Sequence, residues 1–211
     1  LPLFNWKSEN ILPYLQLLED KEVMFTRFSQ IKLCKDISFK KKYTDYTIYI
    51  WNKSTLKYLK ENGFSEFTAS PELSYKVNES IYEENNIQVI VGGKLPLVYT
   101  RNCFNHLFRC DSCKKNQCCK KTVKNVDKNL EFDILCNDDY RYILNSEPIL
   151  NNFSKINVTN QTTFRYVSLG QDIESIKATI KCLKGNNYYN ELIKQDYWKN
   201  SYECNLIEGK E

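Results

Sequence analysis

Residues 87–103 read IQVIVGGKLPLVYTRNC, and this stretch decides the fold more than any other part of the chain. The run from Ile87 to Val91 is rich in β-branched residues, which predicts a buried β-strand that ends at the following pair of glycines. The segment from Leu95 to Thr100 is expected to be extended as well. It leads directly to Cys103, the first residue of a cysteine-rich region.

Upstream of this stretch, short apolar runs alternate with helical patterns. The sequence predicts a strand over Thr47–Trp51, a helix from the capping residue Ser54 to Gly63, a strand over Phe67–Ala69, and a helix from Pro71 to about Glu84. Strands that alternate with helices favour a parallel sheet with right-handed crossover connections. The predicted fold class is therefore α/β, with residues 1–211 as a single domain.

The remaining predicted elements lie on both sides of this core. They are a helix over Ile11–Leu18, a strand over Glu22–Phe28, paired strands over Leu130–Cys136 and Tyr140–Leu144, a strand over Phe164–Leu169 and a helix over Asp172–Leu183. The last helix should bury the face that carries Ile173, Ile176 and Ile180. Residues 186–211 show no clear element.

The composition is that of an ordinary folded protein. Hydrophobic residues make up 42% and charged residues 27%, which argues against intrinsic disorder, and the formal net charge of +4 does not by itself indicate nucleic-acid binding. No run approaches the roughly 18 apolar residues that a membrane helix needs. No signal peptide is recognisable, so we predict a cytoplasmic protein without a membrane partner. The start at Leu1 indicates a removed N-terminus or a piece of a longer protein.

The chemistry of the sequence is concentrated in its cysteines. The chain has nine cysteines and one histidine, and five cysteines fall within seventeen residues, with lysines between them. These five are Cys103, Cys110, Cys113, Cys118 and Cys119, and Cys136 follows after a further seventeen residues. Thiolates bind iron–sulfur clusters and zinc, and nearby lysines favour the thiolate form. Residues 103–136 are therefore predicted to form a metal-binding loop.

Two alternatives to an iron–sulfur cluster stay open. Zinc is the second metal candidate, although only Cys110 and Cys113 form the Cys-x2-Cys spacing that is typical of zinc sites. Disulfides in a secreted protein are the other alternative, and five Asn-x-Ser/Thr sequons give it some support. Because the number of cysteines is odd, full internal pairing is excluded.

Three segments together resemble peptidase family U32. They are Ser70-Pro71-Glu72-Leu73-Ser74, the stretch IQVIVGGKLPLVYTRNC over 87–103, and LEFDILCNDDYRYILNSEPIL over 130–150, and the resemblance covers about residues 45–183. It implies a TIM-like (β/α) barrel, partial or complete. The early glycine-rich strands of that family are absent here, so the chain would be the C-terminal part of such a barrel.

The resemblance also implies a cofactor. Members of the family hold a [4Fe–4S] cluster on four cysteines. Several act in the oxygen-independent hydroxylation of ubiquinone precursors or RNA bases, and others are called collagenase-like proteases. The spacing of Cys103 and Cys110 matches the family's Cys-x6-Cys. Carried over by motif, the ligands would be four of Cys103, Cys110, Cys113, Cys119 and Cys136, with Cys118 as a substitute.

Two further side chains are weak candidates for catalysis. Glu72 could act as a general base, although a glutamate at a helix N-terminus already has a structural role there. Arg101 could bind an anionic substrate or form a surface ion pair. His106, the only histidine, has no recognisable orienting partner, which argues against nucleophilic proteolysis.

The favoured function is that of a U32-type iron–sulfur enzyme that modifies an RNA base or a small aromatic molecule. The alternatives are a metal-stabilised accessory or binding module without catalysis, and a U32 peptidase. The implied partners are RNA and either a partner protein or a missing N-terminal region.

Overall fold

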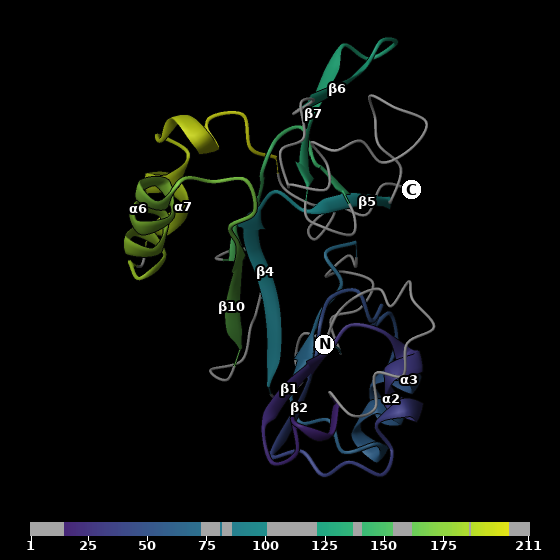
Figure 1. Cartoon of the computed structure of the whole chain (residues 1–211). Coiled ribbons are helices and arrows are strands. Elements are labelled where there is room, and N and C mark those ends of the chain that lie inside the picture. Colours follow the sequence, from purple (N-terminus) through teal and green to yellow (C-terminus); the bar gives the residue numbers. More distant parts are fainter. Residues whose placement is uncertain are drawn as a thin grey trace. The chain divides into compact units, whose positions relative to one another are not determined.

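The computed structural model describes residues 15–72, 81, 86–100, 122–136, 141–153, 162–185 and 187–202 (Figure 1). Its elements are β1 (Glu22–Phe25), α2 (Phe28–Leu33), β2 (Lys41–Thr44), α3 (Lys53–Glu61), β3 (Phe67–Thr68), β4 (Ile87–Gly93), β5 (Pro96–Thr100), β6 (Thr122–Asn125), β7 (Leu130–Cys136), β8 (Arg141–Leu144), β9 (Ile149–Leu150), β10 (Thr163–Val167), α6 (Ile173–Leu183), α7 (Tyr188–Leu192) and the 3-10 helix η2 (Asp196–Trp198).

The chain divides into two compact units, each built from separate segments. The first comprises Leu1–Ile90, Phe153–Arg165 and Cys204–Glu211, and the second comprises Val91–Asn152 and Tyr166–Glu203. The chain therefore passes from one unit to the other four times, and two of these crossings fall within β4 and within β10. The single-domain assignment of residues 1–211 stays a prediction.

The first unit contains parallel strands in chain order. β1 pairs in parallel with β2, a parallel bridge joins Tyr43 to Glu66, and β3 pairs in parallel with β4. The helices α2 and α3 connect these strands, as crossover connections between parallel strands require. The predicted α/β class is thus confirmed.

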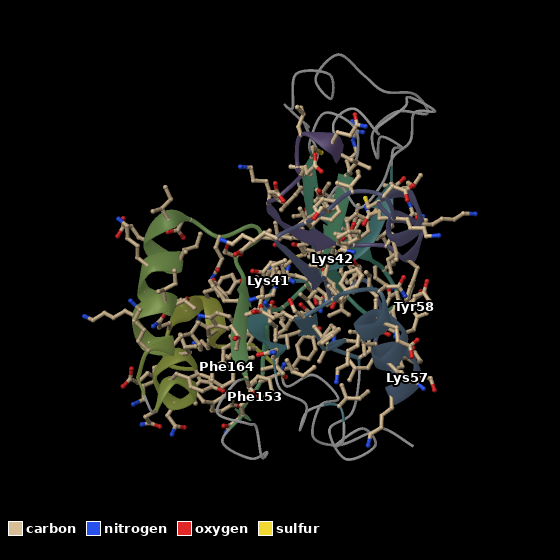
Figure 2. The ribbon with its side chains drawn as sticks, turned by 90° about the horizontal axis from the view of Figure 1, so that it is seen from below. Lys41, Lys42, Lys57, Tyr58, Phe153 and Phe164 are labelled. Carbon is tan, nitrogen blue, oxygen red and sulfur yellow. The ribbon has the colours of Figure 1, made fainter. Side chains whose placement is uncertain are left out.

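Apolar side chains from strands and helices form the core of the first unit. The Phe25 ring lies edge-on to Phe64, with centroids 4.9 Å apart, and Leu56 and Leu59 of α3 are buried. On the same helix Lys57 and Tyr58 are exposed (Figure 2). This difference between the two faces explains why the helix was predictable from its apolar spacing.

The helix caps of α3 and α6 give a matched pair of test sites. Asn52 Oδ1 accepts a hydrogen bond from the Thr55 amide at 2.9 Å, and Asp172 Oδ1 accepts one from the Ser175 amide at 2.9 Å. These bonds satisfy amide groups that have no partner within the helix. The hydrogen bonds from Ser175 lower the pKa of the Asp172 carboxyl below its ordinary value of 3.8.

We expect both caps to stabilise the chain, but only one in a pH-dependent way. Asn52→Ala should cost about 1 kcal/mol of unfolding free energy at any pH. Asp172→Ala should also destabilise at neutral pH. A lowered folded-state pKa gives stability that is present above the unfolded pKa and is lost as pH falls through the folded value. Urea unfolding should therefore show that Asp172→Ala lowers the unfolding free energy less near pH 3 than at pH 7, whereas Asn52→Ala lowers it equally at both. An equal loss for Asp172→Ala at the two pH values would contradict this.

The second unit is built around an antiparallel sheet. Its strand order is β5-β8-β7-β6, and all three pairings are antiparallel. Beside this sheet, β9 pairs with the end of β4, and α6 runs close to α7 (Figure 1). Leu150, Leu192 and Trp198 form the buried apolar cluster of this unit.

Two predictions about the strands are wrong, and the barrel prediction is not confirmed. Within the described residues the strands form three separate sheets and no closed barrel. Thr47–Trp51 is not a strand; the strand is Lys41–Thr44, which pairs with β1. Ile48 and Ile50 are nevertheless fully buried, so the apolar run reflects burial rather than strand pairing. β5 was expected in a parallel sheet, but it pairs antiparallel with β8.

The helix predictions also need correction. The cap of α3 is Asn52 rather than Ser54, and α6 leaves Ile173 68% exposed, so the predicted buried face of that helix is wrong. The elements α2, α7 and η2 were not predicted. Half of the predicted helix over Ile11–Leu18 and most of the one over Pro71–Glu84 lie outside the described residues. None of the helices described is both long enough and apolar enough to reach across a lipid bilayer.

Candidate iron–sulfur site

Most predicted site residues lie outside the part of the chain that the structure describes. This group comprises Arg101, Cys103, His106, Cys110, Cys113, Cys118 and Cys119, whereas Glu72 and Cys136 are described. The described residues alone contain no group of three or more histidine, cysteine or carboxylate side chains that could hold a metal ion. The iron–sulfur prediction therefore depends on where the strands place Cys136 and the two ends of segment 101–121.

Cys136 belongs to a row of three residues across the antiparallel sheet. Arg141, the first residue of β8, pairs on one side with Thr100 and on the other with Cys136. Directly paired residues of antiparallel strands have their side chains on the same face. Since neighbouring strands lie about 4.8 Å apart, Thr100 and Cys136 are separated by about 10 Å.

The described residues that flank the segment 101–121 lie at the end of the sheet where Cys136 lies. β5 runs toward this end and stops at Thr100, directly before the segment. β6 leaves from the same end, because its first residue, Thr122, pairs with Asp133, three positions before Cys136. The predicted metal loop over 103–136 thus comprises residues 103–121, which lie outside the described residues, and the hairpin β6–β7 (Figure 1).

Arg141 is a functional candidate that sequence reasoning missed. Its side chain is fully buried and lies on the same sheet face as that of Cys136, which is half-buried. A buried guanidinium requires nearby acceptors or negative charge to offset the loss of hydration.

The same face of the sheet carries an apolar hollow next to this row. Val98 pairs with Ile143, Ile143 pairs with Ile134, and Phe132 pairs with Val123. Because alternate residues of a strand share a face, these five side chains lie on the face of Arg141 and Cys136, which we call the pocket face. An open pocket of about 290 Å³ is lined by Leu97, Val98, Val123, Lys124, Asn125, Phe132 and Ile143.

The comparisons with known proteins add no relative. No family model, no curated protein and no solved structure matches this chain. The assignment of a function therefore rests on the residues and their geometry alone.

Two other described cysteines differ from the predicted ligands. Burial raises the pKa of the Cys34 thiol, and burial also raises the pKa of Cys182, whose sulfur accepts a hydrogen bond from Gln195 Nε2 at 3.2 Å. Both carry free thiols, and a raised pKa keeps them protonated at neutral pH. They therefore serve as internal controls for metal binding.

The first unit carries a second polar cluster, at the carboxyl ends of β1 and β2. Asp45 directly follows β2, is 7% exposed, and forms an ion pair with Arg165, with Nη1 and Oδ1 2.6 Å apart. Thr47 Oγ1 donates to Asp45 Oδ2 at 2.8 Å and also lies 2.9 Å from the Thr26 carbonyl oxygen. The Arg165 guanidinium lies over the Tyr46 ring, 5.6 Å from its centroid.

This cluster has a structural explanation. It ties β10 to the turn after β2, and the Phe153 and Phe164 rings, 5.4 Å apart, add an apolar contact near the same strand (Figure 2). Sequence reasoning missed the cluster because it predicted a strand at Thr47–Trp51, after Asp45, instead of the strand at Lys41–Thr44 that directly precedes Asp45. A strand at Lys41–Thr44 would have put Asp45 at a carboxyl end, where ligand sites of parallel sheets usually lie.

Glu72, the weak candidate for a general base, is exposed. Its amide donates a hydrogen bond to Ser70 Oγ at 3.3 Å. The catalytic role of Glu72 stays a prediction, as does the anion-binding role of Arg101.

Proposed function

We propose that the chain binds a [4Fe–4S] cluster through the cysteine-rich segment and Cys136, and acts as a U32-type enzyme that modifies an aromatic substrate without oxygen. The observation that carries this proposal is the pairing of Thr100 and Cys136 with the same residue, Arg141. Cys103 follows Thr100 by three residues, which span at most about 10 Å. The first predicted ligand is therefore within reach of Cys136.

The described residues fit the proposed cluster in their chemistry. A thiol lies beside a buried cation, and cations near thiolate-bound clusters offset the negative charge of the sulfur ligands. Four of Cys103, Cys110, Cys113, Cys119 and Cys136 would hold the iron, with Cys118 as a substitute for one of them. When bound, the cluster would supply one-electron redox chemistry or an open iron site. Arg141 would hold Cys136 in place.

The fold supports the proposal only at a coarse level. The parallel strands β1 to β4 follow one another in chain order, as successive strands of a (β/α) barrel do. We propose that they belong to the later part of such a barrel, completed by chain outside this sequence or by a partner.

Iron analysis of anaerobically purified protein tests the proposal. The wild-type chain should be brown and hold about four iron and four sulfide per chain. Cys136→Ser should lose most of the iron, because serine is a poor ligand for this soft site. Cys103→Ser should also lose most of the iron. Because Cys103 does not belong to the paired strands that contain Cys136, a folding defect caused by one substitution would not account for the loss in both variants.

The matched control is Cys182→Ser, which removes a protonated thiol in the same unit. It should keep full iron content. Colourless wild-type protein with one zinc per chain would instead identify a structural metal site and overturn the iron–sulfur proposal. Disulfides among Cys103, Cys110, Cys113, Cys118 and Cys119, detected by mass spectrometry after alkylation under anaerobic conditions, would overturn any metal site.

A further inference from the structure

Arg141 differs from the other charged side chains of the antiparallel sheet in the face on which it lies. The strands β5 to β8 carry four charged residues, Lys124, Glu131, Asp133 and Arg141. Each of the first three is adjacent in its strand to a residue of the pocket face, so these three side chains lie on the opposite face. Among the charged residues of these four strands, Arg141 alone therefore lies on the pocket face.

Arg141 is also the charged residue of these strands that lies nearest in the pairing to a predicted iron ligand. Its side chain has no exposed surface, and its pairing with Cys136 places the two Cβ atoms about 5 Å apart. A guanidinium group keeps its proton at any ordinary pH, so this charge is permanent. Burial makes the interaction of such a charge with a nearby charge stronger than it would be in water.

The need to fill space does not explain an arginine at this position. Ile143 and Ile134 lie next to the row of Arg141 and Cys136 on the same face, and both are apolar. An apolar side chain at position 141 would also fill the sheet, without the cost of removing a charge from water. We therefore looked for a role that requires the charge itself.

We propose that Arg141 raises the reduction potential of the cluster that the proposed function places on Cys136. This inference rests on the proposed function. A cluster held by thiolates gains one negative charge when it takes up one electron from a reductant. A fixed cation beside one of the ligands stabilises the more negative state, so it favours uptake of the electron. Arg141 is thus a positioning residue that acts through Cys136, and not a catalytic residue.

Redox titration of the full-length chain, purified without oxygen, tests this inference. Dithionite is the reductant, and the electron paramagnetic resonance signal of the reduced cluster gives the reduced fraction. At the wild-type midpoint potential, Arg141→Met should lower the ratio of reduced to oxidised cluster about tenfold, which corresponds to a shift of about 59 mV to lower potential. Arg141→Lys keeps the positive charge and should stay close to the wild type.

The matched control is Lys124→Met, which removes a cation from the opposite face of the same sheet. It should leave the ratio unchanged. Iron analysis and circular dichroism accompany each variant, and Arg141→Gln replaces Arg141→Met if the methionine variant does not hold iron. An unchanged ratio in a neutral variant with full iron content would overturn the inference, as would an equal shift in Arg141→Lys or Lys124→Met. Loss of iron from all three Arg141 variants would assign this residue a structural role only, and would also overturn it.

The two proposals fail in different measurements. Wild-type protein without iron overturns the proposed function, and the role of Arg141 with it. Wild-type protein with full iron content and the same midpoint potential as Arg141→Met leaves the proposed function intact and overturns the role of Arg141 alone.

Discussion

Replacing Gly93 by alanine should unfold or severely destabilise the second unit. Gly93 is the last residue of β4 and has a φ of +121°, a conformation that residues with a side chain rarely adopt. A Cβ atom built on it would lie 1.9 Å from the Val167 carbonyl oxygen and 2.8 Å from the Val167 carbonyl carbon. Both are backbone atoms, so no rotamer change can relieve the clash. We expect a loss of more than about 4 kcal/mol in unfolding free energy.

Gly170→Ala is the matched control for this substitution. Gly170 also has a positive φ, +76°, and lies in the same unit, but its added Cβ would meet only the end of the Leu144 side chain at 3.3 Å. It should therefore cost about 1–2 kcal/mol, the cost of the left-handed conformation alone. Urea unfolding followed by circular dichroism compares the two. If both variants lose the same small amount, the close approach of Gly93 to Val167 does not exist in solution.

The sequence predicted the elements whose signals are local. The β4 strand, the strand pair β7 and β8, and the helix α6 were all placed within a few residues of their observed bounds. Each has an apolar run or a capping residue in its own segment. The strand at Lys41–Thr44 has no such signal, because two lysines begin it and its stability comes from pairing with β1. Pairing partners are distant in sequence, and composition alone does not reveal them.

The chemistry of the candidate site stays a prediction, and its geometry was not predictable from the sequence. Cysteine spacing led to the prediction of a metal site that includes Cys136, and only the antiparallel register shows that this residue lies in one row with Thr100 and Arg141. Nothing in the local sequence YRYIL marks Arg141 as buried. The apolar hollow was missed for the same reason, since its lining residues come from four strands and share a face only after the register is known.

Trp198→Ala should be the other strongly destabilising substitution. Trp198 is 1% exposed and packs with Leu150 and Leu192 in the apolar cluster of the second unit. Its indole Nε1 donates a hydrogen bond to Thr179 Oγ1 at 3.1 Å, and the Tyr197 ring meets it edge-on with centroids 4.9 Å apart. The alanine variant loses this contact area and leaves a cavity, for which we expect a cost of about 3–5 kcal/mol.

Two companion variants show which part of Trp198 matters. Trp198→Phe keeps an aromatic ring but removes the donor to Thr179, a residue with no exposed surface, and should cost about 1–3 kcal/mol. Trp51→Ala removes a 52% exposed indole and should change the unfolding free energy by less than about 0.5 kcal/mol. The same packing raises the pKa of the Tyr166 hydroxyl to about 12 through burial. In Trp198→Ala water should reach the Tyr166 hydroxyl, so the pKa of this hydroxyl should fall toward 10. A spectrophotometric titration of the variant measures this change. If neither the titration nor the unfolding free energy changes, Trp198 is not buried.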